Sequence, residues 1–125
     1  MRVRISWSSD ALTATLDDTP TVAALGEALP VEGSADSWGE EVYFSIPIDP
    51  EPEKESRQVV DPGTVCFWIG GGALALPYGP TPISQGDECR LVAECNILGS
   101  LEEDPRRLKS VQDGETIRVE HLPAT

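Results

Sequence analysis

Two adjacent carboxylates, Glu40 and Glu41, lie in a segment with the alternating pattern of a β-strand and are candidates for acid–base chemistry. Successive side chains of a strand point to opposite faces, so these two cannot act on one substrate as an acid and base pair. At most one of them faces a groove, and the sequence leaves open which one. One hypothesis is therefore an enzyme that uses Glu40 as a base, which requires Glu40 to face a concave pocket.

The cysteines and the single histidine offer a second set of reactive groups. Cys66, Cys89 and Cys95 are odd in number, form no Cys-x-x-Cys pair and lie in apolar stretches, where a thiol behaves as a small hydrophobic group. We expect structural free thiols in a reducing compartment. One histidine, His121, and scattered thiols lack the usual spacing of zinc ligands, and no local motif supports a Cys–His nucleophile. We expect no metal site and no cofactor.

Two further stretches resemble ligand loops in composition only. The glycine run at residues 70–72 has no Lys-Ser/Thr after it and precedes a strand, so a wide turn is favoured over a phosphate loop. The acidic stretch at residues 49–55 lacks the alternating oxygen ligands and central glycine of a calcium loop. Its two prolines and its charges predict a solvated loop.

The aromatic residues mark the strongest candidate groove. On one predicted strand Tyr43 is opposite in face to Phe44, and on another Trp68 is opposite to Phe67. We expect Phe44 and Phe67 in the core and the other two rings at the surface. The predicted groove residues are Trp38, Glu40, Tyr43, Trp68, Tyr78, Gly79, Thr81 and Pro82. Such a groove suits a flat, apolar or proline-like ligand, although the same rings could simply cover the outside of a barrel under loops and a helix.

Charge narrows the range of partners. The 125 residues include 22 acidic and 9 basic side chains, a net charge of −13. Binding to nucleic acid or to anionic membranes depends on clustered Lys and Arg, and no basic stripe is present. No apolar run approaches the roughly 20 residues of a membrane span, and the first residues alternate in polarity. We expect a cytoplasmic protein with one domain, residues 1–125; its oligomeric state cannot be predicted.

Alternation with a period of two dominates the chain and predicts about eight short strands. Helical patterns occur at residues 21–29, after a Thr-Pro start, and at residues 105–111. With so few helices to connect parallel strands, the sequence indicates a mainly antiparallel sandwich or barrel.

Several blocks of this sequence resemble the small microbial cyclophilin-like proteins of unknown function, and they occur in matching order over nearly the whole chain. These blocks are WGEEVYFS at 38–45, VVDPG at 59–63, ALAL at 73–76, GPTPIS at 79–84, NILG at 96–99 and DGE at 113–115. The resemblance implies a mainly β fold, a closed antiparallel barrel of about eight strands with two capping helices. It implies a fold and not a reaction, because the family has no known activity.

The expected function is a binding module for a small molecule or a proline-containing peptide. The alternative is a peptidyl-prolyl cis-trans isomerase like the true cyclophilins, in which an arginine of a Phe-His-Arg strand motif acts at the prolyl nitrogen. The comparable strand here, residues 41–45, has no arginine, and only Arg57 or Arg90 from other segments could reach a groove. Whether the protein is an enzyme therefore stays open.

Overall fold

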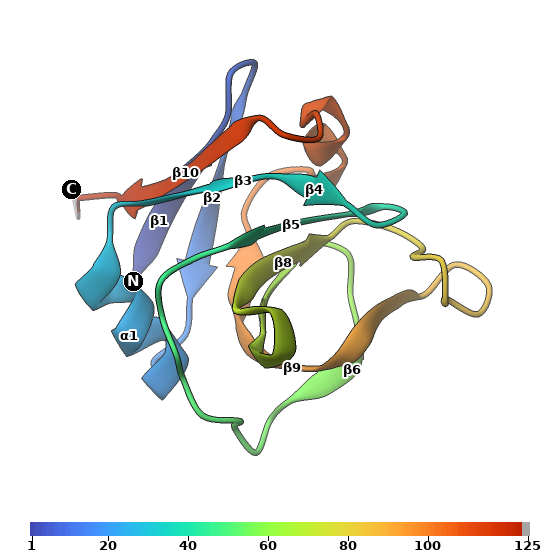
Figure 1. Cartoon of the computed structure of the whole chain (residues 1–125), viewed down its shortest axis with the longest axis horizontal. Coiled ribbons are helices and arrows are strands. Elements are labelled where there is room, and N and C mark those ends of the chain that lie inside the picture. Colours follow the sequence, from blue (N-terminus) through green and yellow to red (C-terminus); the bar gives the residue numbers. More distant parts are fainter. Residues whose placement is uncertain (124–125) are drawn as a thin grey trace.

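The computed structural model describes residues 1–123; residues 124 and 125, which the predicted domain 1–125 includes, lie outside the described residues. The described part is rich in strands (Figure 1). The strands are β1 (Arg2–Ser6), β2 (Ala11–Leu16), β3 (Val31–Ser34), β4 (Asp36–Ser37), β5 (Glu41–Ser45), β6 (Arg57–Val60), β7 (Thr64–Trp68), β8 (Ala73–Pro77), β9 (Cys89–Leu101) and β10 (Thr116–His121).

All strand pairs are antiparallel, in the order β3-β10-β1-β2-β9-β7-β8-β5-β4, with β6 paired to β9 outside this path. The prediction of a mainly antiparallel β fold is confirmed, but residues 1–123 form ten strands instead of about eight. Part of the difference arises because residues 31–37 divide into two strands, β3 and β4, at the buried Ala35.

The hydrogen-bonded order is open, so the closed barrel is not confirmed. Its two end strands, β3 and β4, are successive in the chain. Gly33 brings β3 against β5: a Cβ at this position would lie 2.6 Å from the carbonyl oxygen of Ser45. Within residues 1–123, however, no ladder joins β3 to β5.

Three helical segments complete the fold. Helix α1 (Pro20–Ala28) begins as predicted, because Thr19 caps it by accepting a hydrogen bond from the Val22 amide and proline occupies its first turn. The predicted second helix is a 3-10 helix, η2 (Pro105–Ser110), capped by the Asp104 side chain. The glycine run forms a short 3-10 turn, η1 (Ile69–Gly71), between β7 and β8.

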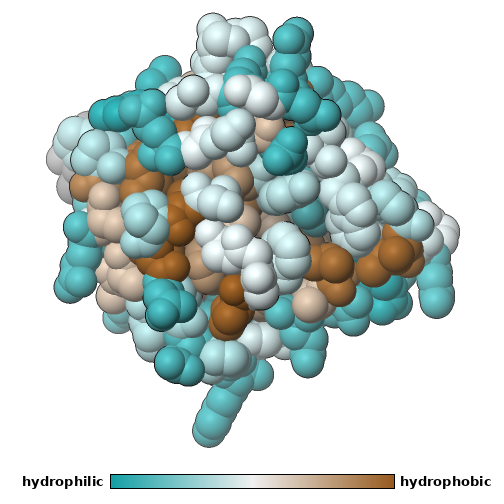
Figure 2. Space-filling view, in the orientation of Figure 1, coloured by the Kyte–Doolittle hydropathy of each residue, from teal (hydrophilic) through white to brown (hydrophobic). Residues whose placement is uncertain are grey.

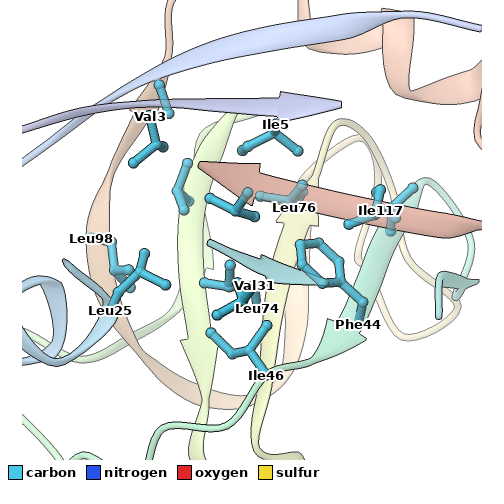
Figure 3. Packing of buried hydrophobic residues seen from close by; sticks show 14 of the residues in the cluster. Val3, Ile5, Leu25, Val31, Phe44, Ile46, Leu74, Leu76, Leu98 and Ile117 are labelled. Carbon is cyan, nitrogen blue, oxygen red and sulfur yellow. The ribbon is translucent and has the colours of Figure 1, made fainter. Parts of the chain in front are cut away.

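The main hydrophobic core fills the space inside the curved sheet (Figure 3). Phe44 and Phe67 are each 1% exposed and lie in the main core, as predicted. Phe44 packs beside Leu74, Leu76 and Ile117. Leu25 of α1 reaches Leu98 of β9 in the same cluster, which fastens the helix to the sheet.

A second, smaller core lies on the opposite face of β7 and β8. It contains Val60, Cys66, Ala75, Cys89, Leu91 and Cys95, with Tyr43, Trp68 and Ile97 packed against it. Strand β6 and the start of β9 supply the outer side of this cluster (Figure 1). Every residue of β8 is consequently buried, which is the pattern of a strand covered on both faces.

A buried amide ties the acidic loop to the fold. Asn96, which is fully buried, donates from Nδ2 to Thr21 Oγ1 and to the Glu51 carbonyl oxygen, both at 2.9 Å. Its Oδ1 accepts from the Glu53 amide at 2.9 Å and from Ser56 Oγ at 3.0 Å. The Glu53 carboxylate accepts from the Thr21 amide and hydroxyl at the start of α1. The loop is therefore anchored at its centre, although the sequence predicted only a solvated segment.

Replacing Asn96 with Ala is expected to lower the free energy of unfolding by about 2 to 4 kcal/mol, because four hydrogen bonds are lost and buried partners are left unsatisfied. Urea unfolding measures this change. Ser56→Ala is the matched control, since it removes one hydroxyl from the same network and should cost about 1 kcal/mol. Equal losses in the two variants would contradict the central role of Asn96.

Candidate functional site

The outer face of β5, β8 and β7 brings together two predicted groove residues, Tyr43 and Trp68, and the carboxylate Glu41. Glu41 and Tyr43 of β5 pair with Pro77 and Ala75 of β8. On the other side of β8, Trp68 pairs with Ala73. The small alanines leave space over β8, and the rings of Tyr43 and Trp68 meet edge to face with centroids 6.3 Å apart and an interplanar angle of 82°.

These side chains form one cavity of about 160 Å³, here called the aromatic cavity. Its lining residues are Trp38, Glu41, Tyr43, Trp68 and Val92. Three of them, Trp38, Tyr43 and Trp68, were predicted as groove residues; Glu41 and Val92 were not. Val92 on β9 is 46% exposed, and Figure 2 shows apolar atoms at the surface toward the loop between β8 and β9.

Glu41 is the charged group of this cavity. Its side chain belongs to a residue that is 5% exposed, and its Oε1 atom has no hydrogen-bond partner among the described residues. Burial raises the pKa of the Glu41 carboxyl from its ordinary 4.5 to about 7. Near neutral pH the group can therefore exchange a proton, or hold a cation, without a large change in conditions.

Glu40, its neighbour, has a different environment. Its side chain is 41% exposed, lies 3.7 Å from Lys109 Nζ and packs against Gly79. Glu40 is not among the residues that line the aromatic cavity. Of the two adjacent carboxylates, Glu41 lines the aromatic cavity and Glu40 does not, so the cavity gives no support to the hypothesis of a base at Glu40.

The remaining predicted residues support the turn that carries Trp38. The Glu40 amide donates to the Pro80 carbonyl oxygen at 2.9 Å, and the Tyr78 amide donates to the Glu40 carbonyl oxygen at 2.8 Å. Gly39 has a φ of +62°, and a Cβ there would lie 2.9 Å from Pro82 Cδ and from the Pro80 oxygen. The two loops therefore pack tightly together.

Two of the predicted groove residues, Thr81 and Tyr78, make their contacts elsewhere in the structure. Thr81 is buried; its hydroxyl donates to the Arg90 carbonyl oxygen and its amide donates to Ser84 Oγ, which holds the loop onto β9. Tyr78 packs against the main core. Tyr78, Gly79, Thr81 and Pro82 thus lie outside the lining of the aromatic cavity.

The glycine run has a structural reason at this site. A Cβ at Gly71 would lie 2.3 Å from Cε3 of Trp68, so the indole rests directly on the turn. Gly72 adopts a φ of +58°, which glycine tolerates without strain. The run is a wide turn as predicted, and it supports the indole of Trp68, which forms one wall of the aromatic cavity.

Arg57 and Arg90, the two arginines that the sequence allowed to reach the groove, do not line the aromatic cavity. Arg57 lines a shallow depression of about 530 Å³ beside the acidic loop, together with residues such as Glu53 and Ile97. Arg90 Nε lies 2.7 Å from Glu88 Oε1. Among residues 1–123, those that line the aromatic cavity include no arginine.

The thiols and the histidine have structural surroundings. Cys66, Cys89 and Cys95 are buried free thiols in the smaller core, and burial raises the pKa of Cys89 to about 11 and that of Cys95 to about 12. His121 Nε2 lies 3.1 Å from the Gly26 carbonyl oxygen at α1. In the described part of the chain, no three His, Cys, Asp or Glu side chains converge as metal ligands would.

No helix within residues 1–123 combines the length and apolar character required to cross a membrane.

Comparison with known proteins gives this fold a family. The family model Cyclophilin-like matches residues 1–120. The solution structure of the hypothetical protein AF2241 from Archaeoglobus fulgidus is similar, with 38% sequence identity and a TM-score of 0.82 over 96% of this chain and 93% of that one. The chain therefore belongs to the cyclophilin-like family, as its sequence blocks indicated. Comparison with curated proteins produced no match.

Replacing Glu41 with Gln is expected to stabilise the protein above pH 7 and to have little effect near pH 4.5. The folded state holds a proton on Glu41 up to a pKa of about 7, whereas the unfolded chain releases it near 4.5. Ionisation therefore costs the wild type stability as the pH rises between these values, up to about 3 kcal/mol. Urea unfolding at several pH values measures the difference.

Glu40→Gln is the control for this experiment, because Glu40 is half exposed beside Lys109. A free energy difference between the wild type and Glu41→Gln that stays constant from pH 4.5 to 8 would show that Glu41 does not titrate as described.

Proposed function

We propose that this cyclophilin-like protein is a binding module that holds a small ligand, or one side chain of a peptide, in the aromatic cavity. The observation that carries the proposal is the Glu41 carboxyl oxygen, which is buried at the cavity wall and has no partner within the described residues. Buried polar atoms are nearly always hydrogen-bonded. An unsatisfied acceptor beside three aromatic rings therefore suits a site that binds a ligand with a hydrogen-bond donor.

The size of the aromatic cavity limits what it can enclose. Its volume of about 160 Å³ is smaller than the roughly 300 Å³ at which pockets for drug-sized molecules begin. It suits a single ring, a head group or one amino-acid side chain. Val92, exposed at its rim, would contact the part of the ligand that extends outward.

The cavity lining favours binding over prolyl isomerisation. The barrier to rotation about an X-Pro bond, ~18–20 kcal/mol, arises from amide resonance, and lowering it requires a donor aimed at the prolyl nitrogen. Glu41 is an acceptor when ionised, and the other lining residues present three rings, whose polar groups are neutral N–H and O–H, and one aliphatic group, so the lining holds no cationic donor among the described residues. A ring of proline size could enter, but no arginine of residues 1–123 is placed in the lining to act on it.

Two finer expectations stay predictions. The close approach of β3 to β5 at Gly33 supports a barrel-like course of the sheet, although these strands share no ladder within residues 1–123. The buried free thiols of Cys66, Cys89 and Cys95 suit a reducing compartment such as the cytoplasm.

Trp38→Ala is expected to raise the dissociation constant of every ligand of the aromatic cavity at least tenfold. Trp38 forms one wall of the cavity and is only partly buried, so the fold should survive its loss. A set of small ring compounds and amines is screened by NMR on the wild type, and the dissociation constant of each hit is measured on both proteins. Tyr78→Leu is the control, since Tyr78 packs on the main core. A blank screen, or hits that Trp38→Ala leaves unchanged, would overturn the proposed site.

A protease-free assay of prolyl isomerisation is expected to give the uncatalysed rate. The physical reason is the absence of a cationic donor in the lining among the described residues. Exchange between the cis and trans forms of a short X-Pro peptide is followed by NMR at increasing protein concentration. A rate that rises in proportion to protein concentration, and falls in Trp38→Ala, would establish the isomerase in place of the binding module.

A further inference from the structure

The aromatic cavity combines two features that select a ligand by charge. Its walls are the rings of Trp38, Tyr43 and Trp68 and the aliphatic Val92, which make most of its surface apolar. Its one carboxyl group is that of Glu41, whose Oε1 accepts no hydrogen bond from the described residues. No lysine or arginine of residues 1–123 is part of the lining, so the carboxylate has no counter-ion at the cavity.

An isolated carboxylate in such surroundings is costly, because removing an ion from water requires several kcal/mol unless a partner compensates. A cation compensates for the charge, and an N–H group satisfies the oxygen. Aromatic faces attract cations further, and apolar walls favour a cation with an alkyl surface. The net charge of −13 on the whole protein also attracts cations toward it.

A hydrated metal ion fits these features poorly. Calcium takes six to eight oxygen ligands and magnesium keeps several waters, whereas the cavity offers one carboxylate among rings. Within residues 1–123, no group of three ligating side chains surrounds it. An organic cation needs only one acceptor and an apolar enclosure.

We infer that the aromatic cavity binds a protonated amine on a compact apolar body, with its N–H donated to Glu41 Oε1 and its carbon atoms enclosed by Trp38, Tyr43 and Trp68. This inference rests on the proposed binding function and names its ligand class. The amine can belong to a free small molecule or to a lysine side chain of a peptide, since both present the same chemistry.

The charge of the ligand can be tested by measuring its affinity at different pH values, which requires an account of the charged and titratable groups around Glu41. Those that titrate or carry charge are Cys66, Cys89 and Cys95 of the smaller core, Tyr43 in the lining, Glu40, which faces Lys109, and Arg57 near Cys66. Burial keeps the pKa of each thiol above its ordinary value, so the thiols stay neutral between pH 6 and 8. The Glu41 carboxyl, with a pKa of about 7, ionises in this range.

The two kinds of ligand therefore respond to pH in opposite directions. An ammonium ion binds the carboxylate, so its affinity rises with pH until Glu41 is fully ionised. A neutral ligand with an acceptor binds the protonated acid, so its affinity falls. For a pKa of about 7, the ionised fraction of Glu41 grows about tenfold from pH 6 to pH 8.

The experiment compares piperidine, a cation at both pH values, with tetrahydropyran, its neutral ring analogue. Each is titrated into the ¹⁵N-labelled protein at pH 6 and at pH 8, and the indole N–H signals of Trp38 and Trp68 report binding. Piperidine should bind up to about tenfold more tightly at pH 8, and tetrahydropyran at least tenfold more weakly than piperidine at that pH. In Glu41→Gln, piperidine should lose at least tenfold in affinity and its dependence on pH; Glu40→Gln should behave as the wild type.

Tetrahydropyran binding as tightly as piperidine at pH 8, or piperidine binding more weakly there than at pH 6, would refute the ligand class and leave the binding function standing. No shift of either indole with either probe would refute the ligand class, and a blank fragment screen in addition would refute the binding function. A capped tripeptide with a central lysine separates the sources: stronger binding than piperidine, with the same response to pH and to Glu41→Gln, supports a peptide amine, and weaker binding supports a free amine.

Discussion

The register between β5 and β8 is the constraint on which the site depends. Because strand side chains alternate, the pairing that buries Val42 and Phe44 in the main core also directs Glu41 and Tyr43 to the opposite face. A slip of one residue would expose Phe44, which is 1% exposed, at a cost of several kcal/mol. The main core therefore holds Glu41 in a position that its own solvation disfavours.

The smaller core covers part of the sheet face on which Glu41 lies. Strand β6 and the start of β9 cover the outer face of β7 and β8, with Cys89, Leu91 and Cys95 packed on Cys66 and Ala75. The same strand, β9, carries Asn96, which anchors the acidic loop and the start of α1, and Leu98, which enters the main core. One long strand thus joins both cores, and its exposed Val92 reaches the rim of the aromatic cavity.

Local patterns in the sequence predicted the local structure well. Alternation placed Phe44 inside and Tyr43 outside, and the Thr19-Pro20 start located α1. The same alternation puts Glu41 on the face of Tyr43, so the sequence contained the reason to choose it over Glu40. Val92 and the smaller core were beyond local patterns, because they depend on β6 and β9 folding back over β7 from distant positions in the chain. Tyr78 and Thr81 were expected in the groove, but the Tyr78 ring packs against the main core and the Thr81 hydroxyl bonds to β9.

The most direct test is the ionisation of Glu41 itself, followed through the ¹³C chemical shift of its side-chain carboxyl between about pH 4 and pH 9. A buried carboxyl without a partner should titrate near pH 7 in the free protein, and saturation with piperidine should lower that midpoint, because a bound ammonium ion favours the charged form. A midpoint near the ordinary 4.5 in the free protein would show that Glu41 is solvated or already paired, and would contradict the account of the aromatic cavity.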